Sequence, residues 1–83
     1  MFIAKITVTL RKSILDPQGK AVLHGSHSIG FDAIKDIRIG KYIEIKIDAP
    51  AEAEARRIAE ETCQKLLANP VMEDYRYTVE QIA

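Results

Sequence analysis

The chain of 83 residues has little that would point to secretion, membrane insertion or nucleic-acid binding. A single cysteine excludes a disulfide within the chain and is typical of a reducing, cytoplasmic protein. No apolar run approaches the roughly 20 residues of a membrane span, and we expect no signal peptide, because a strand pattern begins at Phe2. Twelve basic and twelve acidic residues cancel. This balance argues against binding to nucleic acids or anionic membranes, because proteins that bind them normally carry a basic surface.

The composition is that of one small folded domain. Hydrophobic residues make up 47% of the chain and charged residues 29%, as in ordinary globular proteins. We therefore expect a single domain over residues 1–83. A domain of this size buries only about 60% of its unfolded surface, so association with other chains would add to its stability.

The most regular pattern is an alternation over residues 37–47, in which isoleucine dominates the odd positions and polar residues the even ones. It predicts one long strand with one buried face. A hairpin at Gly40 and Lys41 is disfavoured, because it would leave no single apolar face. Eleven residues span roughly 36 Å, whereas a compact chain of this length has a radius of gyration near 12 Å and a diameter of about 30 Å. We therefore expect one end of the strand to pair with another chain.

Two shorter strands are predicted at the ends of the chain. Residues 2–11 alternate between apolar and mostly polar side chains, and residues 71–82 place Tyr75, Tyr77 and Val79 on one face. The two tyrosines are expected to help fill the core rather than to stack on bases.

Two helices are predicted between the strands. Asp16 is a suitable N-cap before Pro17, and Gly30 ends that first helix, whose apolar stripe contains Gln18, Val22, Gly25 and Ile29. The second helix runs from about residue 51 to 67, with one apolar and one charged face, and ends before Pro70. The order β-α-β-α-β predicts an α+β fold related to the ferredoxin-like plan. In it, two helices cover one face of a small antiparallel sheet with a long middle strand.

Phosphate-binding loops are incomplete in this sequence. The pairs Gly19-Lys20 and Gly40-Lys41 lack the upstream glycine and the following Ser or Thr that a P-loop requires. The backbone geometry of turns and caps explains these glycines better.

Metal-binding and nucleophilic sites are incomplete as well. His24 and His27 are spaced to share a metal, but no third ligand accompanies them. Cys63 lies on the apolar stripe of the second helix and is predicted to be a buried, inert thiol. We therefore expect no catalytic, cofactor-binding or metal-binding residue in this chain.

Four segments together resemble one protein family. They are LDPQGKAV (15–22), HSIGF (27–31), RIGKYIE (38–44) and CQKLLANPVMEDY (63–75), in the family order. Over essentially its whole length the chain resembles PurS, the small subunit of phosphoribosylformylglycinamidine synthase. The stretches 23–26 and 51–61 depart from the family pattern.

The resemblance implies a role in de novo purine biosynthesis. In such split enzymes, formylglycinamide ribonucleotide, ATP and glutamine give formylglycinamidine ribonucleotide, ADP, phosphate and glutamate. A glutaminase subunit releases ammonia, and a large synthetase subunit uses it with ATP and Mg²⁺. A PurS-like chain would be the non-catalytic assembly subunit, itself a dimer or tetramer, that joins the other two and binds no cofactor.

A polar surface near the first helix and the long strand is the candidate for docking these partners. Its residues are Asp16, Lys20, Arg38, Lys41 and Tyr42. Arg38 and Lys41 are the stronger candidates, because a cap or kink would by itself explain Asp16 and the neighbouring glycines. Reversing either charge is expected to weaken complex formation without unfolding the chain.

Two other functions are compatible with this fold class. A regulatory module of the ACT type would bind a small molecule, such as an amino acid, at a dimer interface. An RNA-binding sheet would bind single strands with salt-dependent affinity. Fold alone does not separate these classes, whereas the four segments in register favour the PurS-like function.

Overall fold

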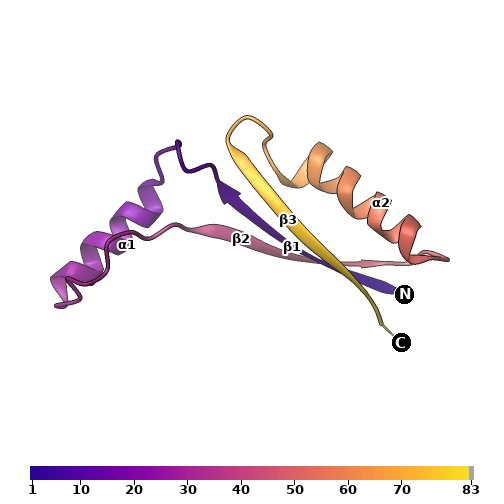
Figure 1. Cartoon of the computed structure of the whole chain (residues 1–83), viewed down its shortest axis with the longest axis horizontal. Coiled ribbons are helices and arrows are strands. Elements are labelled where there is room, and N and C mark those ends of the chain that lie inside the picture. The colour runs from indigo at the N-terminus through magenta and orange to yellow at the C-terminus, as the bar shows by residue number, and fades with distance from the viewer. Residues whose placement is uncertain (83) are drawn as a thin grey trace.

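The computed structural model describes residues 1–82 and has the predicted element order β-α-β-α-β (Figure 1). The strands form one antiparallel sheet, so the predicted α+β class is confirmed. The elements are β1 (Phe2–Leu10), α1 (Pro17–Ser28), β2 (Gly40–Ile47), α2 (Glu52–Thr62), the π-helical turn η1 (Cys63–Leu67) and β3 (Glu73–Gln81).

The sheet has the strand order β2-β1-β3, with β1 in the centre. β2 pairs with β1 along its whole length, with Gly40 opposite Thr9 and Ile47 opposite Phe2. β3 pairs with the other edge of β1 over residues 73–81. β2 and β3 therefore each keep one outer edge without a strand partner in residues 1–82.

The core lies between β1 and α2. Alternate residues of β1 are buried, as the period-2 pattern predicts: Phe2, Ala4, Ile6 and Val8. α2 and η1 contribute small side chains to the core. These are Ala55, Ala59 and Cys63, which follow one another at four-residue spacing and are fully buried. Small side chains let the helix approach the sheet closely.

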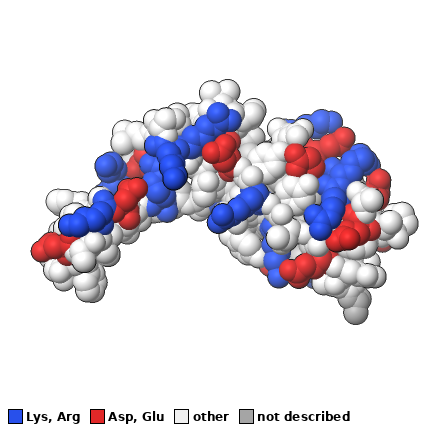
Figure 2. All heavy atoms as spheres, in the orientation of Figure 1, with Lys and Arg blue, Asp and Glu red and all other residues white. Residues whose placement is uncertain are grey.

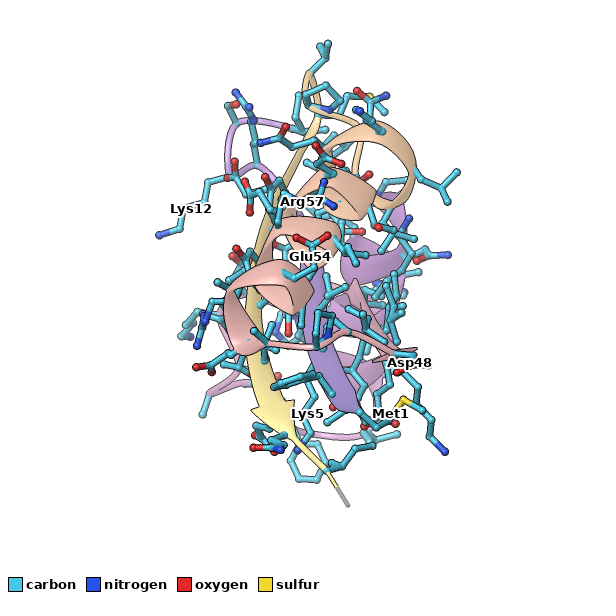
Figure 3. All side chains as sticks on the ribbon, turned by 90° about the vertical axis from the view of Figure 1, so that its right-hand side faces the viewer. Met1, Lys5, Lys12, Asp48, Glu54 and Arg57 are labelled. Atoms are coloured by element: carbon cyan, nitrogen blue, oxygen red, sulfur yellow. The ribbon has the colours of Figure 1, made fainter. Side chains whose placement is uncertain are left out.

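The outer face of α2 is charged, as the sequence predicts. Glu54 and Arg57 lie next to each other there, and the Arg57 guanidinium donates to carboxylate oxygens of both Glu54 and Glu61 (Figure 3). Each side chain in these pairs is more than 40% exposed, and exposed ion pairs contribute little to the stability of a fold. The opposite face of the sheet carries the polar residues of β1 and β2, and no helix of residues 1–82 packs across it.

The position of α1 corrects the prediction that both helices cover one face of the sheet. α2 packs against all three strands, whereas α1 lies beyond the end of the sheet (Figure 1). Together with the extended segment that follows it, α1 forms an arm, defined here as residues 17–39. The reason is a tertiary hydrogen bond: Asp16, which caps α1, also accepts from the amide of Ile39. The start of α1 is thereby tied to the extended segment that leads into β2, which we call the extension of β2.

The predicted apolar stripe of α1 is consequently on the surface. Val22 is 48% exposed and Ile29 is 71% exposed. Instead, Gly19 and Ser26 are the buried residues of this helix. Gly30 does end it, with a positive φ of 97°, a conformation that glycine adopts at little energetic cost.

The arm makes the molecule long. The radius of gyration is 16.4 Å and the principal extents are 51 × 29 × 14 Å, whereas a compact chain of this length would have a radius near 12 Å. The chain is therefore more extended than a compact domain of its length. Most of the α1 surface is therefore exposed, apart from Gly19 and Ser26.

Two strand boundaries differ from prediction. β2 begins at Gly40 and not at residue 37, because β1 pairs no further than Thr9 and the Ile39 amide bonds to Asp16. β3 begins at Glu73 and not at residue 71, because the amides of Met72 and Glu73 donate to the Asn69 carbonyl in a turn. No helix in residues 1–82 is long and apolar enough to cross a membrane.

Candidate docking surface

Asp16 uses both carboxylate oxygens to hold the base of the arm. Oδ1 accepts the amide of Gly19 at 2.9 Å, so Asp16 is the N-cap of α1 as predicted. Oδ2 accepts the amide of Ile39 at 2.7 Å. The bond from Ile39, followed by that from Gly19, holds the pKa of Asp16 below its ordinary value. With only 3% of its surface exposed, Asp16 holds the base of the arm and offers little surface to another chain.

Arg38 joins the same base from the other side. Its Nη2 donates to the carbonyl oxygens of Arg11 at 2.8 Å and Ile14 at 3.1 Å. These bonds fix the loop between β1 and α1 against the segment that leads into β2. A guanidinium has five N–H donors, so Arg38 retains donors for a partner on its exposed side.

Four of the five predicted docking residues are exposed: Lys20, Arg38, Lys41 and Tyr42. Lys41 lies 3.7 Å from the Glu73 carboxylate. Tyr42, which is 61% exposed, donates to Glu44 at 3.1 Å. Partial burial, and then this bond, raise the pKa of Tyr42. Lys20 lies in the first turns of α1.

Arg11 has a structural role that the sequence analysis missed. Its Nη2 donates to the Pro70 carbonyl at 2.6 Å, its amide donates to Met72, and its Nε lies 3.4 Å from Asp74. These contacts tie the end of β1 to the turn before β3. A cavity of about 460 Å³ lies beside them, lined in part by Arg11, Gln64, Pro70, Asp74 and Tyr75. A lone arginine at a strand end gave no signal of this role in the sequence.

Glu60 links α2 to β3 and was likewise missed. The Tyr75 hydroxyl donates to Glu60 Oε1 at 2.6 Å, and Gln64 donates to the same oxygen at 2.9 Å. The Tyr75 bond, the largest cause, lowers the pKa of Glu60 and raises that of Tyr75. Tyr75 and Tyr77 are partly buried against the core, as predicted.

Replacing Tyr75 by phenylalanine is expected to raise the pH at which the chain unfolds in acid. The pKa of Glu60 is lower in the folded state, so its contribution is present above its unfolded pKa and is lost as the pH falls. Removing the hydroxyl removes the main cause of this shift. Acid titration followed by circular dichroism measures the midpoint, with the exposed Tyr42→Phe variant as control. An unchanged acid midpoint in Tyr75→Phe would show that the bond carries no stability.

The residues considered for metal or nucleophilic chemistry are not brought together. The Nε2 atom of His27 lies 2.8 Å from the Ile34 carbonyl oxygen. Within residues 1–82 there is no group of three or more His, Cys, Asp or Glu residues placed to hold a metal ion. Cys63 is fully buried, as predicted, and burial raises the pKa of its thiol.

The two candidate phosphate loops do not have the geometry of such sites. The Gly19 amide donates to Asp16, so it is already occupied. The Cα of Gly40 faces the Val8 carbonyl so closely that a side chain would overlap it. Charges of both signs are interspersed on the visible face, over the arm and over the sheet (Figure 2).

Comparison with known sequences identifies one family. The model of the PurS family, "Phosphoribosylformylglycinamidine (FGAM) synthase", matches residues 3–81. The chain is 46% identical over 82 residues to the phosphoribosylformylglycinamidine synthase subunit PurS of Bacillus subtilis, covering 99% of this chain and 96% of the relative. It is 35% identical to that of Methanocaldococcus jannaschii, covering 99% of each chain.

Solved structures agree with this assignment. The chain is similar to B. subtilis PurS with a TM-score of 0.87 and 47% identity, covering 98% of this chain and all of that one. It is also similar to a chain of PurLQS from Thermotoga maritima, with a TM-score of 0.85 and 26% identity, covering 96% of this chain and 99% of that one.

Proposed function

Since the chain belongs to the PurS family of phosphoribosylformylglycinamidine synthase subunits, we propose that it is the accessory subunit that joins the glutaminase and synthetase subunits. The assembled enzyme would convert formylglycinamide ribonucleotide, ATP and glutamine into formylglycinamidine ribonucleotide, ADP, phosphate and glutamate. The observation that carries the proposal is similarity over nearly the entire chain, including to a chain of the PurLQS assembly.

The shape of the chain supports a joining role. Ammonia released into water would be protonated and lost, so the two active sites must be held in register and sealed from solvent. An arm and a sheet arranged over 51 Å offer separate surfaces to different partners. The hydrogen bonds of Asp16 and Arg38 hold the arm in place, so the spacing of these surfaces is set before assembly.

We assign chemistry and cofactors to the partners. ATP and Mg²⁺ would bind the synthetase subunit, and this chain would contribute no catalytic residue. Its single, buried thiol is in keeping with a cytoplasmic location. Self-association into a dimer or tetramer is part of the proposal, because the arm exposes apolar side chains that one chain does not cover.

The proposed function is tested by omitting the chain. Purified glutaminase and synthetase subunits are assayed for glutamine-dependent formation of formylglycinamidine ribonucleotide, with and without it. Activity that appears only on its addition supports the assembly role. Activity indifferent to it, with no co-elution of the three chains, would overturn the proposal and favour a ligand-binding module of the ACT type.

Lys20, Lys41 and Tyr42 are proposed to face a partner subunit, supported by Asp16 and Arg38. Reversing the charge of the exposed Lys20 by Lys20→Glu is expected to weaken assembly about tenfold, the size of one interfacial charge contact of about 1.4 kcal/mol. Folding should be unaffected, because its side chain lies on the surface. Equilibrium titration of the partner subunits measures the change, with the exposed Lys12→Glu as control. Equal affinities for the two variants would remove Lys20 from the interface.

A further inference from the structure

We propose that the polar face of the sheet, opposite α2, binds a carboxylate of a partner subunit, with Arg76 as the main contact. The inference rests on the proposed joining role and adds a defined site to it. The occupant is an aspartate or glutamate side chain that the glutaminase or the synthetase subunit presents to this face.

An open hollow lies on the polar face, at the middle of the central strand. Its volume is about 250 Å³, and the residues that line it include Lys5, Thr7, Tyr42, Arg76 and Thr78. Two of these side chains are cationic and three carry a hydroxyl group, and no described residue that lines the hollow is acidic. Ammonium, guanidinium and hydroxyl groups all donate hydrogen bonds. The lining is therefore complementary to an oxyanion.

The register of the sheet fixes the geometry of the hollow. Thr7 of β1 lies opposite Tyr42 on one side and opposite Arg76 on the other. Neighbouring strands are about 4.8 Å apart, so the Cα atoms of Tyr42 and Arg76 are roughly 10 Å apart, with Thr7 between them. Lys5 lies two residues away from Thr7 on the same face of β1. A carboxylate above Thr7 is therefore within reach of both cations.

Arg76 is exposed and makes no ion pair within residues 1–82. Two acidic residues share its face of β3, and both are engaged elsewhere. Asp74 lies 3.4 Å from the Arg11 guanidinium. Glu80 lies 3.4 Å from the Lys5 ammonium. The Arg76 guanidinium thus keeps its donors for another chain, and such a group binds a carboxylate through two parallel hydrogen bonds.

The size of the hollow favours one side chain over a free ligand. Pockets for small molecules have volumes of about 300–1,000 Å³ and enclose most of the ligand, whereas this hollow is smaller and open. A carboxylate carried by a docked subunit would be shielded from water by the surrounding interface, which strengthens its contact with a cation. Tyrosine and arginine are enriched among the residues that dominate such interfaces, and Tyr42 and Arg76 border this hollow together.

The hollow continues the candidate docking surface across the sheet. Tyr42 belongs to that surface and lines the hollow from β2. No helix of the described chain packs across the polar face, so a partner would reach Arg76 without displacing any element. The three strands hold Thr7, Tyr42 and Arg76 in one row before assembly, which lowers the entropic cost of binding.

Equilibrium titration with each partner subunit separately tests the site. Arg76→Gln removes the charge and is expected to weaken binding of one partner by at least about thirtyfold, as when one member of a buried, hydrogen-bonded charge pair is truncated. Arg76→Lys keeps the charge without the two parallel donors and should recover part of this loss. Arg56→Gln, the same change on the exposed face of α2, is the control and should bind like the wild type.

The salt dependence of binding gives a second readout, which a purely structural role of Arg76 would not change. Salt screens charge contacts, so the affinity of the wild-type chain should fall as the NaCl concentration rises. The affinity of the Arg76→Gln variant should fall less steeply. Denaturant unfolding of the two chains controls for folding, and equal stabilities are expected because Arg76 is exposed.

Other occupants of the polar face are separated by two further measurements on Arg76→Gln. Sedimentation equilibrium would show weaker self-association if a second copy of the chain bound there. Titration of inorganic phosphate into the chain alone would show saturable binding, lost in the variant, if a free oxyanion bound there. Either result, with unchanged affinity for both partners, would overturn the proposed occupant.

The outcomes also separate this inference from the proposed function. A large loss of affinity for one partner in Arg76→Gln, with a flatter salt dependence, supports the carboxylate site. Wild-type affinity of this variant for both partners overturns the site and leaves the joining role intact, because the omission assay tests that role independently. A wild-type chain that binds neither partner overturns the joining role and the site with it.

Discussion

Gly19→Ala is expected to destabilise the chain, whereas Gly25→Ala, in the same helix, is expected to stabilise it. A methyl group on Gly19 would overlap the Ile37 carbonyl oxygen and crowd the Asp16 carboxylate, while one on Gly25 would meet no atom within 4 Å. Overpacking of this kind costs about 1–3 kcal/mol. Glycine in a helix interior is about 0.5–1 kcal/mol less favourable than alanine, and at Gly25 nothing opposes that gain.

Denaturant unfolding followed by circular dichroism, at one fixed protein concentration, measures both free energies of unfolding. The Gly19 variant is also expected to lose affinity for the partner subunits, because the base of the arm must move away from the extension of β2. Both variants replace glycine by alanine in the same helix, so the gain from helix propensity is the same in each. The difference between them then reports the contacts of the added methyl group. Equal stability of the two would show that Gly19 is not confined by the segment before β2.

Ile6→Ala is expected to remove much of the stability of the chain. Ile6 lies in the central strand between Ile43 and Tyr77 and is fully buried. Truncating a buried isoleucine to alanine costs about 2–5 kcal/mol, against a total of about 4–12 kcal/mol for a domain of this length. The small core makes this loss severe, because few other large side chains are fully buried.

The matched control is Thr7→Ala, at the next position of β1. Its side chain lies on the opposite face of the sheet, across which no helix of the described chain packs, so a change below about 1 kcal/mol is expected. The two free energies of unfolding are measured by denaturant titration at equal protein concentration. Comparable losses in both variants would mean that the two sheet faces are equally buried, contrary to the fold described above.

Local patterns were enough to predict most elements. The alternation around Ile6 and along β2 identified the strands and their buried faces, because side-chain direction in a strand depends only on neighbouring residues. Asp16 and Gly30 marked the ends of α1, because capping is also local. The four segments identified the family, which the match over residues 3–81 confirmed.

The exposure of the candidate docking residues was predicted only in part. Lys20, Arg38, Lys41 and Tyr42 lie at the surface, as expected. Asp16 is instead buried, and both Asp16 and Arg38 form hydrogen bonds with the backbone of their own chain that the sequence did not predict. The charge of a residue and its position in the sequence do not reveal whether its side chain will form a hydrogen bond with a distant backbone group.

The sequence by itself determined the strands, the helix ends, the buried faces of the sheet and the family. Tertiary structure decided where α1 lies, where β2 begins and how the loops are held. The physical reason is distance along the chain: Asp16 binds Ile39 across 23 residues, Arg38 binds Arg11 across 27, and Arg11 binds Pro70 across 59. Such bonds depend on the folded path of the whole chain, and no local pattern encodes them.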